Sequence, residues 1–508
     1  MSELTRRSVL GAAAAAALSQ AAPGSRPNIL FVCSDQHSGA VMGHAGHPQV
    51  KTPHMDRLAA RGVTFQSCYS GNPVCVPGRA SLMTGQFASD VESYCNSTPF
   101  RGQTPTWGNR LKSAGYHPWA TGKLDLWKDK DLGFEEDGTT HGHCTDPDIT
   151  SLFRSPVCFR PKERNNANGT FSDRQAPDLA KVQKAMKFLR ERSRALGKPW
   201  AAYVGVSKPH PKFDAALKYK DIYPAEKMLL PEIPPGYLEN RHPMFQVLAN
   251  YKNIATPVPA DRVRKARSAY YGLVSEVDEL LGQLLDELDR TGQMENTLVI
   301  YTSDHGEMLG EHGLWLKNVL LEGAARVPLI MAGAGLPRGK TIATPVSHVD
   351  LVATMMEAGG VAKAKELRGN SLLPVCRGER GAHPEFAFSE SHSEGNATGS
   401  FLIRKGDWKY IYFSGDRPLL FHLKNDPGEF HNLAGQPQTK AIQQELDGIL
   451  RSLVDPDAVS EAAFRRQDEV LRQLVASSTK EDFYENLVGR LGPMQARSIT
   501  NQCYRRKV

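Results

Sequence analysis

The sequence has little of several features that mark common classes of protein. Its eight cysteines in 508 residues are irregularly spaced and include no Cys-x-x-Cys pair, which excludes a disulfide-built scaffold and a paired-cysteine metal site. It has no run of five or more basic residues, and its net charge of +7 is mild for this length, so nucleic-acid binding is not indicated. Beyond residue 24 it has neither internal repeats nor an apolar segment long enough to span a membrane, so we expect no stable membrane insertion.

What is present is an ordinary globular composition, 40% hydrophobic and 23% charged. A chain of this length can bury one large core and a smaller second unit. Its mildly positive charge suits an anionic small substrate.

The N-terminus carries a short apolar stretch behind two arginines. Arg6 and Arg7 precede an apolar run at 9–18, which is followed by small residues. This run is too short to cross a bilayer but matches the core of a signal peptide. The sequence therefore predicts a twin-arginine signal peptide over residues 1–24 and a periplasmic or secreted location. The alternative is an alanine-rich helix at the start of a cytosolic protein.

Strands alternate with helices through most of the chain. Apolar runs predict buried strands at 26–35 and 296–306, and further strands are predicted at 117–123, 199–207 and 326–333. Capping signals, stop signals and apolar periodicity predict helices at 52–62, 106–116, 179–196, 262–292 and 347–360, the first with Thr52 as N-cap and Gly62 as stop. The alternation predicts an α/β fold in which helices flank a mostly parallel sheet. After about residue 380, segments at 399–413 and 418–429, joined by a turn at 414–417, predict an antiparallel hairpin. A helix near 438–454 and a charged helical tail follow.

Two predicted strands end in acidic residues. Asp35 is followed by Gln36 and His37, and Asp304 is followed by His305. Chemistry in such folds lies beyond the carboxyl ends of the strands, so these side chains are candidates to meet. Two carboxylates and an imidazole could bind a divalent cation. The alternative is that each acid only caps the next helix.

Cys75 lies in the stretch "NPVCVPGRASLMTGQ", where Pro73, Pro77 and Gly78 predict a shaped turn leading into a helix at 79–84. Backbone N–H donors at a helix start favour an anion. Arg79 lies one helical turn onward and offers a bidentate guanidinium to a tetrahedral oxyanion. The local pattern therefore favours a nucleophile held against an anion.

The segments around these residues resemble those of a known family. "CVPGRASLMTG" matches the type I sulfatase signature, C-x-P-x-R followed by a Leu-rich turn and Thr-Gly. Companion segments occur in the expected order: "PNILFVCSDQ", "TPHMDRLAARGVTF", "ATGKLD", "SKPHPKF", "YTSDHGEMLGEHGLWLK", "RVPLIMAG" and "FHLKNDPGEFHNLA". The resemblance covers residues 26–436 and implies the alkaline-phosphatase-like α/β fold. The pair Asp304 and His305 resembles the branch that includes choline sulfatase, iduronate sulfatase and phosphonate monoester hydrolases.

The resemblance implies that a formylglycine-generating enzyme, reading C-x-P-x-R, oxidises Cys75 to formylglycine (3-oxoalanine). The aldehyde hydrate has two hydroxyl groups: one attacks sulfur and displaces the alcohol, and the other lets the hydrate collapse and expel sulfate. The implied metal is Ca2+, held by Asp35, Asp304, His305 and residue 75, with Mn2+ or Mg2+ as alternatives. Ser34 stands where many members have a second acid, a departure shared with other Asp-His members.

The resemblance also implies cations around the sulfate group. Arg79, Lys123, His210 and Lys317 match the family's sulfate-binding and leaving-group positions, with His210 as the better candidate for the general acid. Family members commonly have a histidine two residues after this lysine, but here that residue is Asp125. Asp125 is then the base itself, or His141 or His143 replaces the missing histidine.

Asn96 lies 21 residues after Cys75, where Asp-His members place an asparagine that contacts substrate. Polar, proline-rich loops at 141–176 and 212–260 favour a sulfated saccharide as the substrate, among sulfated small molecules. The first hypothesis is a sulfuric ester hydrolase. The alternatives are a phosphonate monoester or phosphodiester hydrolase with the same site, and an unmodified relative that only binds sulfated glycans.

The predicted organisation is a signal peptide at 1–24, a sulfatase catalytic domain at 25–378, an α+β subdomain at 379–455 and a helical tail at 456–508. The tail is expected to pack on the body or on a second subunit, which gives a route to a homo-oligomer. Among the remaining cysteines, Cys33 is expected to be a packed thiol. Export would permit a disulfide between Cys144 and Cys158.

Overall fold

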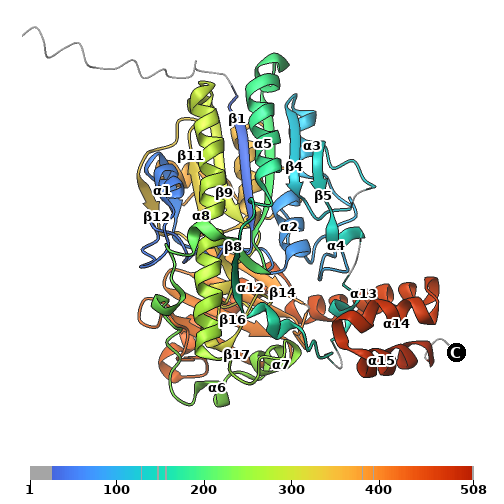
Figure 1. The fold of residues 1–508 in the computed structure, drawn as a ribbon. Helices are drawn as coiled ribbons and strands as arrows, with labels where there is room; N and C mark the ends of the chain where they lie inside the picture. Colours follow the sequence, from blue (N-terminus) through green and yellow to red (C-terminus); the bar gives the residue numbers. More distant parts are fainter. Residues whose placement is uncertain are drawn as a thin grey trace, which may run out of the picture.

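The central strand β1 (Asn28–Asp35) is buried along all but its first residue and lies between two parallel neighbours, β7 (Trp200–Pro209) and β9 (Thr297–Ser303). The computed structural model describes residues 26–505 except 128, 146–147, 155–156, 380 and 393 (Figure 1). The predicted signal peptide lies outside the described residues. Among the described residues, none of the helices combines the length and hydropathy that a membrane span requires.

The main sheet has eight strands in the order β12-β2-β11-β9-β1-β7-β4-β5. Its other strands are β2 (Gly62–Phe65), β4 (His117–Lys123), β5 (Glu135–Thr140), β11 (Leu329–Ala332) and β12 (Lys340–Ile342). Neighbouring strands are parallel except at β11, which is antiparallel to both β2 and β9. The prediction of a mostly parallel α/β sheet is therefore confirmed.

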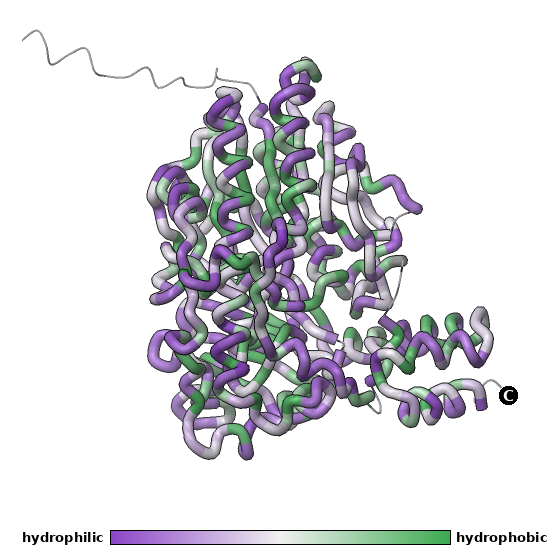
Figure 2. The backbone as a smooth tube through the Cα atoms, viewed as in Figure 1, coloured by the Kyte–Doolittle hydropathy of each residue, from purple (hydrophilic) through white to green (hydrophobic). Residues whose placement is uncertain are grey.

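Helices cover both faces of this sheet (Figure 1). Because side chains alternate along a strand, Ile29 and Phe31 of β1 join one core, whereas Leu30 and Val32 join the core on the opposite face. The first core includes α2 (Cys75–Thr84), α3 (Trp107–Ser113) and α10 (His348–Ala358), and the second includes α1 (Pro53–Ala60), α5 (Leu179–Lys187) and α8 (Ala260–Arg290). Hydrophobic residues accordingly gather along the central strands (Figure 2).

Shorter elements complete the catalytic region. The strands are β3 (Cys68–Tyr69), β6 (Gly169–Ser172), β8 (Phe213–Ala216), β10 (Arg326–Val327) and β13 (Val346–Ser347). The helices are α4 (Gly142–Thr145), α6 (Tyr237–Asn240), α7 (Pro243–Tyr251), α9 (Glu322–Ala325) and α11 (Leu373–Arg377).

Three local predictions need correction. The helix expected at 79–84 begins four residues earlier, so Cys75 is its first residue and not part of a preceding turn. The helix expected at 179–196 is α only to Lys187 and continues as a π turn and a 3-10 turn. Thr52 occupies the N-cap position of α1 without capping it; Asp278 of α8 instead accepts hydrogen bonds from the backbone N–H groups of His54 and Met55 at 3.1 and 2.7 Å.

The C-terminal unit is larger than the predicted hairpin. Four antiparallel strands occur in sequence order: β14 (Phe386–Ser391), β15 (Ser400–Lys405), β16 (Trp408–Phe413) and β17 (Asp416–His422). Helix α12 (Lys440–Leu453) packs Leu446 and Leu450 against Phe401 and Ile403 of β15. The tail forms α13 (Pro456–Ser477), α14 (Lys480–Leu491) and α15 (Pro493–Arg505), which project to one side of the molecule (Figure 1). All eight cysteines are free thiols, so no disulfide joins Cys144 and Cys158.

A buried lysine ties the C-terminal sheet to the catalytic region. Lys409 of β16 is fully buried, and its Nζ lies 2.9 Å from Glu322 Oε1 of α9 and 2.7 Å from Glu429 Oε1. One cation therefore faces two carboxylates, the buried Glu429 and the partly buried Glu322. Burial and the charge of Glu322 raise the pKa of Glu429 to about 7, despite Lys409. We expect Glu429 to hold a proton in the native state at mildly acidic pH.

This raised pKa predicts that stability falls as pH rises from about 5 to above 7. The native state keeps the Glu429 proton in this window, whereas an unfolded glutamate with the ordinary pKa of 4.5 has lost it. Glu429→Gln should weaken this fall by on the order of 1–3 kcal/mol, as measured by thermal unfolding at pH 5 and pH 8. The control Glu445→Gln changes an exposed glutamate of α12 and should keep the wild-type dependence. An unchanged dependence in Glu429→Gln would show that this carboxyl group does not carry the effect.

Candidate active site

Three elements bring one cluster of ligand atoms together. Asp35 ends β1, Asp304 and His305 follow β9, and Cys75 opens α2. One atom from each of these four residues lies within 4.8 Å of the others, and all four side chains are buried. Cys75 Sγ lies 3.3 Å from His305 Nε2 and 3.9 Å from Asp35 Oδ1. The predicted metal ligands therefore meet at one point.

The geometry follows from strand pairing and one glycine. β1 and β9 are parallel neighbours with Ser34 opposite Ser303, so their carboxyl ends lie side by side. Gly78 allows α2 to approach these ends, because a Cβ there would lie 2.6 Å from the backbone oxygen of Asn72 and 3.1 Å from that of Asp304. The glycine of the C-x-P-x-R stretch thus permits close packing of the helix.

Arg79 is fully buried and bonded to protein groups. Its Nε donates to Asp304 Oδ2 at 2.9 Å, and its Nη2 lies 3.5 Å from Asp35 Oδ2. Its Nη1 donates to the backbone oxygen of Lys123 at 2.7 Å and to the hydroxyl of Tyr203 at 2.9 Å. The guanidinium group therefore holds the two carboxylates in place.

Two lysines surround Cys75 with positive charge. Lys317 Nζ lies 2.8 Å from Cys75 Sγ, and Lys123 Nζ forms an ion pair with Asp35. Burial and Asp35 raise the pKa of the Cys75 thiol, but Lys123, Lys317 and His305 outweigh them and hold it well below the ordinary value. The position of residue 75 therefore favours an anion.

A strained segment carries Lys317. Its neighbours Leu316 and Asn318 both have left-handed backbone, with φ of 66° and 82°. Lys252, only 2% exposed at the end of α7, donates from Nζ to the backbone oxygens of Trp315 at 2.9 Å and Lys317 at 2.5 Å. These two bonds fix the backbone that aims the Lys317 ammonium group at Cys75.

His210 and Asn96 also reach the neighbourhood of Cys75. His210 follows β7 and is paired by its Nδ1 with the backbone oxygen of Pro211 at 2.7 Å. Burial and Lys317 lower the pKa of His210, whereas Asp35 and a hydrogen bond with Cys75 partly raise it. Asn96 Oδ1 accepts the backbone N–H of Val76 at 3.1 Å, so this side chain contacts the start of α2.

Asp125 lies between Lys123 and His143. Its Oδ2 is 3.2 Å from Lys123 Nζ and 2.8 Å from His143 Nδ1. Burial raises the pKa of Asp125, but Lys123 and His143 lower it by more. The net pKa is below the ordinary value, so this carboxylate stays ionised. The other candidate, His141, has both ring nitrogens paired elsewhere: its Nδ1 pairs with the backbone oxygen of Leu126 at 2.7 Å and its Nε2 with Glu136 at 3.0 Å.

The sequence did not reveal three supporting residues. Gln36 has φ of 72°, accepts from Lys317 Nζ at 3.1 Å through Oε1 and donates through Nε2 to Glu307. Glu307 Oε1 in turn accepts the backbone N–H of Leu316 at 2.7 Å. Lys252 completes the set. Of the three, only Gln36 could have been singled out from the sequence, because it follows Asp35 directly. Glu307 and Lys252 contact residues that are far from them in the chain.

Comparisons with known proteins agree with this site. The sulfatase family model matches residues 27–361, and the model for the C-terminal part of N-sulphoglucosamine sulphohydrolase matches residues 310–455. The choline-sulfatase of Rhizobium meliloti (strain 1021) is 33% identical over 441 residues, which cover 83% of this chain and 85% of that protein. Arylsulfatase K of Danio rerio is 29% identical over 464 residues, covering 87% of this chain and 86% of that protein.

A phosphonate monoester hydrolase from Silicibacter pomeroyi has a similar solved structure, with a TM-score of 0.70 and 27% identity, covering 85% of this chain and 96% of that one. Fold and site together define an alkaline-phosphatase-like hydrolase of the formylglycine type. Within that class the chain belongs to the sulfatase family and is a sulfuric ester hydrolase.

The Lys252 contacts predict a loss of turnover when its amino group is removed. Lys252→Met keeps the apolar stem but removes the ammonium group that donates two hydrogen bonds to the backbone around Lys317. We therefore expect kcat to fall about ten- to a hundredfold, with a smaller change in KM. Steady-state kinetics on an aryl sulfate would measure this. The control Lys218→Met removes an exposed lysine and should leave kcat unchanged. A wild-type kcat in a folded Lys252→Met protein would contradict the positioning role.

Proposed function

We propose that this sulfuric ester hydrolase removes sulfate from a sulfated carbohydrate, using formylglycine formed at Cys75 and a divalent metal beside it. The observation that carries the proposal is the buried cluster of Asp35, Cys75, Asp304 and His305, with ligand atoms within 4.8 Å of one another. Ammonium groups beside the cluster supply the positive charge that an anionic ester requires.

The donor set fits a hard divalent cation. Carboxylate oxygens and one imidazole are suitable ligands, and a cation between two fully buried carboxylates would offset their repulsion. We propose Ca2+ as the metal, held by Asp35, Asp304, His305 and residue 75, with Mn2+ or Mg2+ as alternatives. A bound metal would make a hydroxyl group at residue 75 more acidic and would polarise the sulfate group.

The environment of residue 75 supports its proposed conversion by a formylglycine-generating enzyme. The hydrated aldehyde would supply one hydroxyl group to attack sulfur and a second that allows sulfate to leave. The cations that lower the pKa of the Cys75 thiol would equally favour an anionic oxygen at this position. These cations would therefore stabilise the nucleophile as well as bind the anionic substrate.

The surrounding residues divide the remaining tasks. Hydrolysis breaks the bond between sulfur and the ester oxygen, and that oxygen must gain a proton as the alcohol leaves. We assign this proton to His210, with Lys317 neutralising the charge on the same oxygen. Lys123 faces the sulfate oxygens, and Asn96 contacts the substrate. Arg79 acts as a positioning residue, because it is bonded to the two carboxylates and to neighbouring protein groups.

His143 is the best candidate to replace the histidine missing from the Lys-x-His pattern. Its Nδ1 bonds to Asp125, which fixes the tautomer, and its Nε2 has no partner among the described residues. This arrangement resembles the carboxylate-oriented imidazole of a catalytic triad. We propose that Nε2 accepts a proton in the second half of the reaction, when sulfate leaves, and that Asp125 stabilises the resulting imidazolium.

Phosphonate monoester or phosphodiester hydrolysis is the second candidate activity. The structural similarity to a phosphonate monoester hydrolase at 27% identity favours testing it, since one site can attack sulfur or phosphorus. Choline sulfate is a further test substrate, because a relative at 33% identity is a choline-sulfatase. A carbohydrate remains the proposed substrate on account of the polar loops at 141–176 and 212–260.

Export and assembly complete the proposal. We propose twin-arginine export to the periplasm or beyond it, which carries folded proteins and is compatible with maturation of Cys75 before export. We keep the predicted division into a catalytic domain at 25–378, an α+β subdomain at 379–455 and a tail at 456–508. The tail would also offer a surface for a homo-oligomer.

The proposed function is tested on protein produced with and without a formylglycine-generating enzyme. Mass spectrometry of the peptide containing residue 75 should show conversion only with that enzyme, and sulfate release should rise with the converted fraction. Turnover is compared across sulfated saccharides, choline sulfate, an aryl sulfate and an aryl phosphonate; saccharides should give the highest kcat/KM. Cys75→Ala should lose activity by at least about a thousandfold. An active Cys75→Ala variant would overturn the mechanism, and preference for the phosphonate would overturn the substrate assignment.

The role of His143 predicts which half of the reaction its removal slows. His143→Ala should lower kcat about a hundredfold. Rapid-quench measurements should show a burst of alcohol release followed by slow sulfate release. His141→Ala, whose ring nitrogens pair away from Asp125, is the control and should stay near wild type. Slow alcohol release in the first turnover of His143→Ala would instead place this residue in the first half of the reaction.

A further inference from the structure

The C-terminal tail lies beyond both matched family models, which end at residues 361 and 455. Its helices α13 and α14 nevertheless contact segments beside the active site. Two of their arginines contact acidic residues near Asn96: Arg466 contacts Glu92, and Arg490 contacts Asp148, to which Ser97 is hydrogen-bonded. The tail is therefore placed to act on a residue that we assign to substrate binding.

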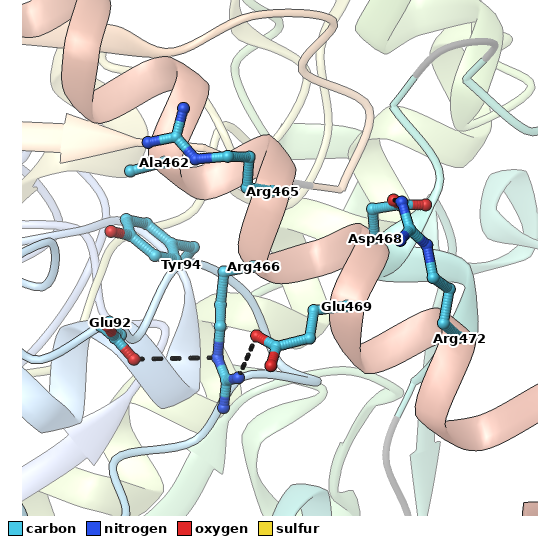
Figure 3. A pocket seen from close by; sticks show the side chains of 8 residues that line it. All are labelled: Glu92, Tyr94, Ala462, Arg465, Arg466, Asp468, Glu469 and Arg472. Carbon is cyan, nitrogen blue, oxygen red and sulfur yellow. Dashed lines mark hydrogen bonds and ion pairs between the residues drawn. The ribbon is translucent and has the colours of Figure 1, made fainter. Parts of the chain in front are cut away.

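The first contact reaches the segment before Asn96. Arg466 of α13 lies with its Nε 3.8 Å from Glu92 Oε2, and its Nη1 is 2.6 Å from Glu469 of the same helix (Figure 3). These residues line a cavity of about 470 Å³ between α13 and the segment that contains Glu92 and Tyr94. Tyr94 is only 4% exposed and lies two residues before Asn96.

The second contact reaches Asp148, which is hydrogen-bonded to Ser97, the residue after Asn96. Arg490 of α14 lies with its Nη1 2.7 Å from Asp148 Oδ2, an oxygen that also receives Arg160 at 2.9 Å. Asp148 is 5% exposed, and its backbone oxygen accepts the hydroxyl of Ser97 at 2.7 Å. A buried carboxylate with two guanidinium partners therefore fixes the loop to which Ser97 is bonded.

Asn96 lies between these two attachments and touches the catalytic helix. Its Oδ1 accepts the backbone N–H of Val76, the residue after Cys75, at 3.1 Å. A continuous set of bonds thus runs from Arg490 through Asp148 and Ser97 to the segment that carries Asn96. A shift of this segment would move the Asn96 amide relative to residue 75.

We propose that the helical tail is a clamp that positions Asn96 for substrate, and that Arg490 is its principal positioning residue. This inference rests on the substrate-binding role assigned to Asn96 under the proposed function. The tail would act on substrate affinity and not on the chemical step, because none of its contacts described above reaches the metal ligands.

The test compares Arg490→Ala with Arg472→Ala in the full chain. Arg472 of α13 pairs with Asp468 of its own helix and not with Asp148, so it is a control for the loss of one tail arginine. Arg490→Ala should raise KM about fivefold with kcat nearly unchanged, Arg490→Lys should restore most of the affinity, and Arg472→Ala should behave as wild type. Amide hydrogen exchange at 92–98 should accelerate only in Arg490→Ala.

A double-mutant cycle with Asn96→Ala separates the clamp from general destabilisation. If the tail acts through Asn96, Arg490→Ala should add little to KM once Asn96 is alanine. Additive effects, or an unchanged KM in Arg490→Ala, would overturn the clamp. An Asn96→Ala protein with wild-type KM would instead overturn the role of Asn96 in the proposed function, whatever the tail does.

Discussion

The active site depends on two buried carboxylates held together against their own repulsion. Asp35 and Asp304 are both fully buried at adjacent strand ends, and burial together with the charge of Asp35 raises the pKa of Asp304. Two desolvated like charges are strongly unfavourable unless cations are built around them. Arg79 supplies one such cation from within α2 itself, bonded to Asp304 and close to Asp35. The helix that presents residue 75 is thereby fastened by charge to the strand ends that hold the ligands.

Backbone strain gathers around this charge cluster. Left-handed φ values occur at Gln36 next to Asp35, at Asp125 beside Lys123, and at Leu316 and Asn318 on either side of Lys317. Such conformations are unfavourable for residues with side chains and persist only where many other contacts determine the backbone. Lys252, Glu307 and their hydrogen bonds provide such contacts around Lys317. The strain therefore marks positions where the direction of a side chain matters more than local stability.

The sequence predicted the parts of the site that follow from strand ends and from short motifs. Asp35 and Asp304 could be placed because each ends an apolar run, and parallel strands align their ends. Asp278 could not be predicted as the cap of α1, and Lys252 could not be connected with Lys317, because both relations join residues far apart in the chain. The start of α2 was missed because Pro77 suggested a turn, although proline is tolerated in the first turn of a helix.

Charge also relates the encoded cysteine to the proposed finished catalyst. In the unconverted chain Lys123, Lys317 and His305 favour a thiolate at Cys75, and the charge of that thiolate in turn raises the pKa of Lys317. Conversion to an uncharged aldehyde would remove that anion and leave the same cations without it. A sulfate ester brings negative charge to this position, so its binding would restore the balance. The cations that favour a thiolate before maturation are then the ones that favour substrate afterwards, which gives a physical reason for a nucleophile derived from cysteine within a strongly cationic site.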